Sequence, residues 1–221
     1  MIRVNPSFQC NPRLMLPRVY ALTDVRLSGL SHVEQVELLS AGGATLIQLR
    51  EKGMAPREFY EQAKKAVAVA VQRGVRLIIN DRVDVALAVG AAGVHLGQDD
   101  MPPEAARRLL GSEAVIGYST HNIEQAIAAT NLPIDYLAIG PIFATTSKSD
   151  TAPVLGREGL RAVRRAIGAF PLVAIGGITS ANAAGVIEAG ADSVAVISAL
   201  LCDPTHITEV TRKLNLDLGQ T

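Results

Sequence analysis

The sequence lacks tryptophan, and aromatic residues make up only 4% of its 221 positions. Its 21 lysines and arginines balance its 21 aspartates and glutamates, so the broad basic field that supports non-specific nucleic-acid binding is missing. Apolar runs are short. The stretch 83–96 is interrupted by Asp84, Gly90 and His95 before it reaches the roughly 20 residues that a membrane span requires. We therefore expect neither a nucleic-acid partner nor a membrane segment.

Cysteine is equally scarce. Cys10 and Cys202 lie near the two ends of the sequence, and no CxxC pattern or metal-ligand spacing occurs. Residues 1–18 hold no apolar segment followed by a small-residue cleavage site, so they differ from a secretory signal peptide. We expect two reduced thiols in a protein of the cytoplasm.

Apolar residues are abundant, at 48%, and they follow two alternating patterns. Short β-branched or apolar runs, typical of buried strands, occupy 19–24, 44–50, 76–81, 93–98, 114–120, 135–141, 171–177 and 193–198. Helical periodicity follows over 31–43, 56–74, 84–93, 102–111, 122–131, 157–170, 180–190 and 204–216. Strands that alternate with helices in this way are typical of a parallel sheet.

Eight strands, each followed by a helix, predict an α/β fold, a single-domain (β/α)8 TIM barrel. We assign residues 1–17 to an irregular N-terminal lead-in, 18–215 to the barrel and 216–221 to a C-terminal tail. The alternative is an open doubly wound sheet, which would favour a GxGxxG motif after the first strand. That strand ends in LTDVRLSG instead. In a barrel, the chemistry is expected at the carboxyl ends of the strands.

Charged side chains follow three successive predicted strands. Gln48, Arg50 and Lys52 alternate along the second strand and so project from one face. A guanidinium fork and an ammonium point charge together suit a polyphosphate. Asp81 and Asp100 follow the next two strands and could share a hard cation, because Mg²⁺ is usually held by one or two carboxylates plus substrate phosphates.

The longest predicted connection, 142–157, is polar and adds a third cation, Lys148. Three cations, two carboxylates and a magnesium ion make a set that binds diphosphate. Gly177 and Ser198 end the last two strands, where barrels commonly bind a phosphate through backbone N–H groups. A diphosphate site beside a monophosphate site predicts two phosphorylated substrates, one of which loses its diphosphate.

Each of these residues also has a purely structural interpretation. Asp81 and Asp100 could cap the helices that follow them. His95 lies on a core strand and is more typical of a packed, hydrogen-bonded histidine than of a base, whereas His121, at a strand end, could serve either role. The joint placement favours a site, because unrelated structural roles would not gather polar residues at one end of the barrel.

Seven motifs, in order along the chain, resemble the thiamine phosphate synthase family. They are QLREK (48–52), IINDRVDVA (78–86), GVHLGQDD (93–100), GYSTH (117–121), DYLAIGPIFATTSKSD (135–150), VAIGGI (173–178) and VISA (196–199). Each motif alone is modest, but the seven together are highly specific and cover roughly residues 18–200. The family's loop usually reads Thr-x-Thr-Lys, and Ser147 stands here in place of its second threonine.

The resemblance implies a role for each matching residue. It implies that Asp81 and Asp100 bind Mg²⁺. By the same resemblance the diphosphate is held by Arg50, Lys52, Asn80 and Lys148, the pyrimidine by Gln48 and Ser119, and the thiazole phosphate by Thr145, Ser147, Gly177, Ile197 and Ser198. The residues predicted to be catalytic are Arg50, Lys52, Lys148 and Ser119.

The resemblance also implies a Mg²⁺-dependent transferase of thiamine biosynthesis. It would join hydroxymethylpyrimidine diphosphate to hydroxyethylthiazole phosphate: diphosphate departs from a carbocation-like pyrimidine methylene, which the thiazole nitrogen attacks. Two alternatives stay open at this point, a thiazole tautomerase-like isomerase and a non-catalytic thiazole phosphate-binding barrel. The expected partners are these small-molecule substrates, and the sequence leaves a homo-oligomer open.

Overall fold

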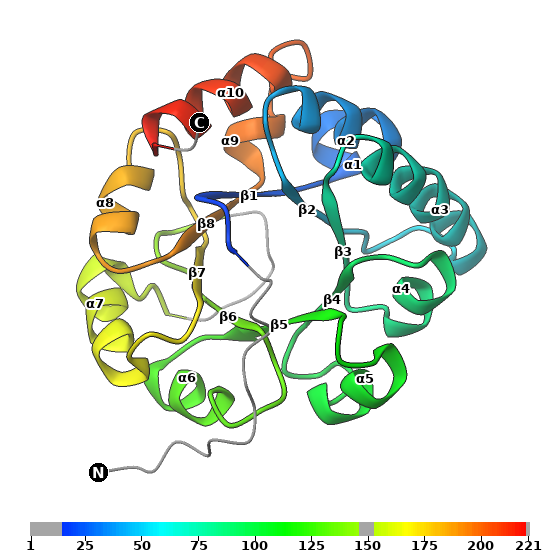
Figure 1. Cartoon of the computed structure of the whole chain (residues 1–221). Coiled ribbons are helices and arrows are strands. Elements are labelled where there is room, and N and C mark those ends of the chain that lie inside the picture. The colour runs from blue at the N-terminus through cyan, green and yellow to red at the C-terminus, as the bar shows by residue number, and fades with distance from the viewer. Residues whose placement is uncertain (1–14, 146–152, 220–221) are drawn as a thin grey trace.

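The structure of the chain is a computed structural model, which describes residues 15–145 and 153–219. Within these residues, eight parallel strands close into a barrel in the order β1 to β8, and helices surround it (Figure 1). Each strand pairs with the next one along the chain, and β1 pairs with β8 to complete the ring. The predicted (β/α)8 barrel is confirmed, and the open doubly wound alternative is wrong.

All eight strands lie inside the segments that the sequence predicts. They are β1 (Val19–Leu22), β2 (Leu46–Leu49), β3 (Arg76–Asn80), β4 (Gly93–Leu96), β5 (Val115–Thr120), β6 (Tyr136–Ile139), β7 (Leu172–Ile175) and β8 (Ser193–Val196). Nearly every strand residue is buried, since the strands lie between the packed barrel interior and the surrounding helices.

Each predicted helical segment overlaps a helix of the structure. The helices are α1 (Val25–Ser28), α2 (His32–Ala41), α3 (Pro56–Gln72), α4 (Val83–Val89), α5 (Pro103–Leu110), α6 (Ile123–Ala129), α7 (Gly156–Ile167), α8 (Ala183–Glu188), α9 (Ser198–Leu201) and α10 (Ile207–Asp217). The sequence did not predict α1 or α9, because four residues are too few to show a helical period. None of the helices in residues 15–145 and 153–219 is long and apolar enough to span a membrane.

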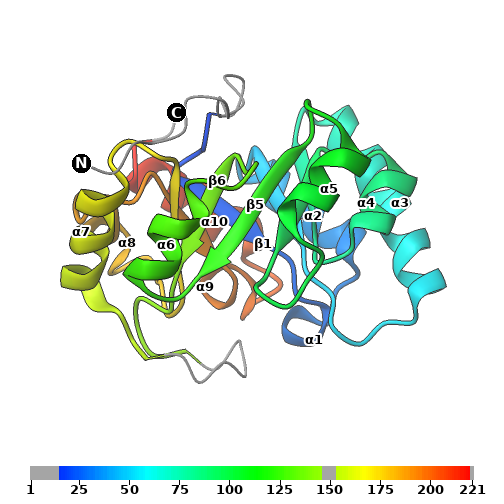
Figure 2. The ribbon, with the colours of Figure 1, turned by 90° about the horizontal axis from the view of Figure 1, so that it is seen from below.

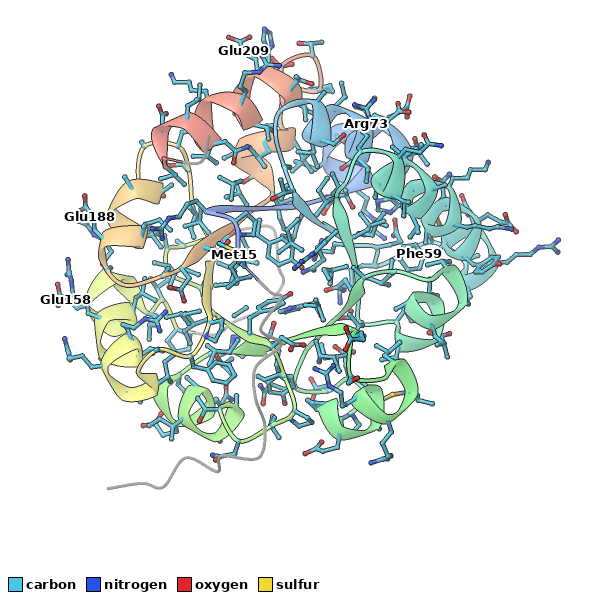
Figure 3. The ribbon with its side chains drawn as sticks, in the orientation of Figure 1. Met15, Phe59, Arg73, Glu158, Glu188 and Glu209 are labelled. Carbon is cyan, nitrogen blue, oxygen red and sulfur yellow. The ribbon has the colours of Figure 1, made fainter. Side chains whose placement is uncertain are left out.

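The helices bury one face and expose the other. On α3, Phe59, Ala63 and Ala70 are buried at helical spacing against the strands. Figure 3 shows the opposite tendency in Glu158 and Glu188, which point away from the barrel on the outer rim of α7 and α8. This division into an apolar and a charged face holds the helix ring on the barrel.

Two arginine–aspartate pairs fasten helices to the amino ends of strands. Arg107 Nη2, on α5, lies 2.7 Å from Asp135 Oδ2, which also accepts from the backbone of β5 at 2.7 Å. Arg164 Nη2, on α7, lies 2.6 Å from Asp192 Oδ2, which accepts from the backbone of β7 at 2.8 Å. Both pairs span 28 residues, so the same arrangement is built twice in the barrel wall.

Because the strands are parallel, their carboxyl ends gather at one end of the barrel. Figure 2 shows this end: α1, which follows β1, lies at the lower edge of the view, where the β5 arrow also points. The polar residues singled out in the sequence follow the strands at this end, so they can form one site.

Candidate active site

Most of the predicted site residues meet at the carboxyl ends of the strands. An open cleft there is lined by Arg50, Lys52, Asn80, Asp81, Asp100, Ser119 and Ser198. A second pocket is lined by Ser119, Thr145, Gly177, Ile197 and Ser198, and it shares Ser119, His121 and Ser198 with the cleft. Gln48 lines a smaller cavity, together with Arg50 and Asn80. Ser147 and Lys148 lie outside the described residues.

The two acidic residues lie close together in the cleft. Burial raises the pKa of Asp100; the N–H of Gly97, 2.6 Å from Oδ2, opposes this, and the hydrogen bond and charge of Asp81 raise the pKa further. Two carboxylates this close repel each other unless they share a proton or a cation. The pair is therefore a place for positive charge.

Neither aspartate caps a helix. Asp81 has a left-handed backbone, with φ of 61°, in a turn closed by the Arg82 N–H and the Asn80 carbonyl at 2.8 Å. The N-cap of α4 is Arg82, and that of α5 is Pro102. The interpretation of Asp81 and Asp100 as helix caps is therefore wrong. The Asp81 carboxylate pairs with Lys52, and the Asp100 carboxylate accepts the Gly97 N–H. A non-glycine residue at positive φ is uncommon and is often found at functional sites.

The two cations at the end of β2 already have acidic partners. Lys52 Nζ lies 2.5 Å from Asp81 Oδ2, with half of the lysine side chain exposed. Arg50 Nη1 lies 2.9 Å from Asp24 Oδ2, and this pair is largely buried. Asp24 follows β1 and also caps α1, so it holds the guanidinium at the rim of the cleft. The pairing of Arg50 with Asp24 was not predicted, because α1 and α2 separate the two residues along the chain.

Hydrogen bonds to the Glu51 side chain hold the loop that carries Lys52. Glu51 Oε1 accepts the N–H groups of Lys52 and Gly53 at 2.8 and 2.7 Å. Its Oε2 lies 3.3 Å from Nε2 of the buried His32, whose Nδ1 lies 2.8 Å from Thr23 Oγ1. Burial raises the pKa of Glu51, but these N–H groups outweigh it and the pKa lies below its usual value. Burial also lowers the pKa of His32.

The second pocket is formed by close backbone approaches. Gly177 has φ of 64°, and a Cβ atom there would lie 2.6 Å from the Ala144 carbonyl oxygen. Only glycine fits this position without strain. Beside it, Ile197 and Ser198, at the start of the short helix α9, line the same pocket. Apolar side chains, among them Ile175 and Ile178, complete the lining.

Comparison with known proteins places this geometry in a family. A family model described as thiamine monophosphate synthase matches residues 19–200. The thiamine-phosphate synthase of Chloroflexus aurantiacus is 50% identical over 198 residues, which is 89% of this chain and 90% of that one. That of Albidiferax ferrireducens is 50% identical over 189 residues, covering 85% and 86%. The chain belongs to the thiamine monophosphate synthase family.

A solved structure agrees with this membership. Thiamine phosphate pyrophosphorylase from Pyrococcus furiosus is 40% identical, with a TM-score of 0.81, and the match covers 91% of this chain and 96% of that one. By its family and these relatives the chain is a transferase, a thiamine-phosphate synthase, and the isomerase and non-catalytic alternatives are not favoured. The roles of single residues stay predictions.

Sequence reasoning did not assign Asp24 and Glu51 to the site, although both line the cleft. It left His121 between a structural and a functional role, and the structure places it on the lining of both the cleft and the second pocket. Nδ1 of His121 donates to the Gly140 carbonyl oxygen at 2.8 Å, so Nε2 of the same ring points away from Gly140. Asp24 stood at the end of the first strand in LTD, so its position was a usable signal. His95 is packed and hydrogen-bonded through both nitrogens, as predicted.

Proposed function

We propose that this member of the family is a Mg²⁺-dependent enzyme that joins hydroxymethylpyrimidine diphosphate to hydroxyethylthiazole phosphate. The products are thiamine phosphate and diphosphate. The observation that carries the proposal is the adjacency of the acidic and basic cleft to the second pocket, with Ser119 and Ser198 on the boundary of both. Two anionic substrates bound on either side of this boundary would place their reacting atoms next to each other.

The cleft supplies the groups that a leaving diphosphate needs. Arg50 and Lys52 provide positive charge, and each can exchange its present carboxylate partner for a phosphate oxygen. Asn80 supports the same assignment: its Nδ2 is buried and makes no hydrogen bond to any residue that the structure describes. A buried donor without an acceptor is costly, and a phosphate oxygen would satisfy it. We assign Lys148, from the segment outside the described residues, to the same group.

The donor set also fits a magnesium ion. Among the described residues no three His, Cys, Asp or Glu side chains cluster as a metal site. Mg²⁺, however, needs only one or two carboxylates when substrate phosphates complete its shell, and Asp81 and Asp100 are such a pair. When bound, the ion would neutralise charge on the leaving diphosphate. Without it, the Lys52 ammonium balances Asp81.

The reaction itself asks little of acids and bases. The bond between the pyrimidine methylene and the bridging oxygen breaks, and its electron pair leaves with diphosphate. The lone pair of the thiazole nitrogen then forms the new C–N bond, so no proton has to move. We assign Gln48 and Ser119 to the pyrimidine, and Thr145, Ser147, Gly177, Ile197 and Ser198 to the thiazole phosphate. Apolar neighbours such as Ile175 would keep water from the cationic methylene.

The direct test is to incubate the purified chain with both substrates, with Mg²⁺ or with a chelator. We expect thiamine phosphate and diphosphate in equal amounts, only with the metal. Diphosphate release without thiamine phosphate would contradict the assigned thiazole pocket. Equal turnover in the chelator would contradict the metal assignment of Asp81 and Asp100.

A further inference from the structure

A chain of hydrogen bonds crosses the barrel interior beneath the cleft. Gln48 Nε2, on β2, donates to the Tyr20 hydroxyl at 3.0 Å. The hydroxyls of Tyr20 and Tyr136 lie 3.0 Å apart, and Tyr136 Oη lies 3.0 Å from His95 Nδ1. His95 Nε2 lies 2.8 Å from Ser119 Oγ. The chain thus connects Gln48 with Ser119, the two residues assigned to the pyrimidine. We call it the interior relay.

The interior relay is buried and closely packed. All five side chains are buried, with Tyr20 and Tyr136 almost completely so. The His95 and Tyr136 rings are stacked, with centroids 5.6 Å apart. Gly117 makes this contact feasible, because a Cβ atom there would lie 2.3 Å from the Tyr136 hydroxyl and 2.5 Å from His95 Nδ1. Glycine inside a strand often marks such a close approach.

The direction of each bond follows if every buried proton has an acceptor. The amide nitrogen of Gln48 can only donate, so Tyr20 accepts from it. Tyr20 gives its single proton to Tyr136, because this buried proton would otherwise have no acceptor in the relay. Tyr136 then donates to His95 Nδ1, which leaves the imidazole proton on Nε2, facing Ser119. Ser119 Oγ therefore accepts from His95.

Three consequences follow for the ends of the relay. The Ser119 proton is free to donate to a ligand in the cleft, and Gln48 turns its Oε1 acceptor away from Tyr20. A doubly protonated imidazole would leave a buried tyrosine proton without an acceptor, which is costly. Burial raises the pKa of both tyrosines, so the hydroxyls keep their protons.

The two ends are coupled. If Gln48 turned its amide over, Tyr20 would donate to Oε1, every bond of the relay would reverse, and Ser119 would become a proton acceptor toward the ligand. The reversal needs all four bonds and the histidine tautomer to change together. One end therefore offers an acceptor whenever the other offers a donor, and the observed arrangement has Gln48 as acceptor and Ser119 as donor.

We propose that Tyr20, Tyr136 and His95 are positioning residues that hold Gln48 as an acceptor and Ser119 as a donor, so that the site selects an aminopyrimidine over its oxo analogue. The inference rests on the proposed function. An amino group of the pyrimidine donates to Gln48 Oε1, and a ring nitrogen accepts from Ser119. An oxo group at the same place would bring its acceptor oxygen against the Gln48 Oε1 acceptor. The cavity lined by Gln48 and the cleft lined by Ser119 share Arg50, Asn80 and His95, so the two ends of the relay border adjoining spaces.

The test uses the aminopyrimidine diphosphate as substrate and its oxo analogue, also as the diphosphate, as an inhibitor of the reaction. Wild-type turnover of the amino substrate is measured first, and its absence would refute the proposed function rather than the relay. We then compare the ratio of the oxo inhibition constant to the amino KM in wild type, Tyr136→Phe and Tyr20→Phe. Each substitution keeps the aromatic ring but removes the hydroxyl, and so interrupts the hydrogen bonds of the relay. Tyr60→Phe is the matched control, because Tyr60 is a half-buried residue of α3 that lines neither the cleft nor the pockets.

We expect both relay variants to lower this ratio about tenfold, the effect of roughly one hydrogen bond, while Tyr60→Phe leaves it unchanged. In a Ser119→Ala background, Tyr136→Phe should change the ratio less, because only its effect through Tyr20 and Gln48 remains. A loss of stability in Tyr136→Phe is checked by its denaturation midpoint, and Tyr20→Phe supplies an independent cut. An unchanged ratio in two folded relay variants would overturn the proposal, as would an equal effect of Tyr136→Phe with and without Ser119.

Discussion

The two arginine–aspartate pairs of the barrel wall allow the effect of aspartate burial on stability to be tested within one molecule. We consider Arg107→Met and Arg164→Met, in which methionine keeps an apolar stem but removes the guanidinium. Each arginine also donates to backbone carbonyls, for example to Ala114 at 2.6 Å and to Gly190 at 2.7 Å, so those losses are similar. The aspartates differ: the Asp135 side chain is 3% exposed and that of Asp192 is 48% exposed.

This difference sets the expected magnitudes. Removing one partner of a buried ion pair costs about 3–5 kcal/mol, because a charge is left in a poor solvent. An exposed pair contributes only about 0–1 kcal/mol. We therefore expect Arg107→Met to lower the free energy of unfolding by about 3 kcal/mol more than Arg164→Met. In a domain of this size, that difference corresponds to roughly 6–12 °C in Tm.

Urea titration followed by circular dichroism measures both variants, with the slope of the transition checked for constancy. Synthase activity without denaturant is the companion measurement, and it should stay near wild type in both, since these pairs lie at the amino ends of the strands. Equal losses of stability, or a larger loss in Arg164→Met, would show that aspartate burial does not govern the strength of these pairs.

Three further predictions concern the site. Lys52→Met should tighten Mg²⁺ binding to the substrate-free chain in calorimetry, because the ammonium no longer competes for Asp81, yet lower kcat about 100-fold; weaker Mg²⁺ binding would contradict this. His32→Gln should lose about 1–2 kcal/mol at pH 7.5 and less at pH 5.5. The pKa of His32 is lowered on folding, so the unfolded chain takes up a proton first as pH falls through about 6.5, and wild-type stability declines there; a pH-independent difference in denaturation midpoint would argue against it. Gly177→Ala should raise KM for the thiazole phosphate about tenfold or more and leave KM for the pyrimidine substrate near wild type, because its Cβ would displace the Ala144 carbonyl; steady-state kinetics with each substrate varied decides this.

The barrel could be predicted because its elements have strong and separate signals. Each strand is a short apolar run, and each of the longer helices has an apolar stripe, as on α3. The boundaries and the shortest elements could not be predicted in the same way. Seven of the eight strands end one or two residues before their predicted runs do, because segments such as Arg50–Lys52 bend away to form the cleft.

The sequence predicted most of the residues that line the cleft, but not which of them form ion pairs or hydrogen bonds with one another. Asp81 and Asp100 were placed together by the rule that parallel strands end at one edge, and the hydrogen bond and charge of Asp81, which raise the pKa of Asp100, agree with this. The Arg50–Asp24 pair depends on how a loop folds, which no local pattern encodes. Tyr20 and Tyr136 read as ordinary core residues, since their alternation is the same whether or not their hydroxyls meet.

The left-handed backbone of Asp81 has a consequence for the evolution of this position. A non-glycine residue in that conformation costs on the order of 1 kcal/mol, and its exposed pair with Lys52 returns less than that. Replacing Asp81 with glycine should therefore yield a sturdier but inactive protein. Selection for robustness alone would remove this aspartate, so its presence in the chain agrees with the metal-binding role proposed for its carboxylate.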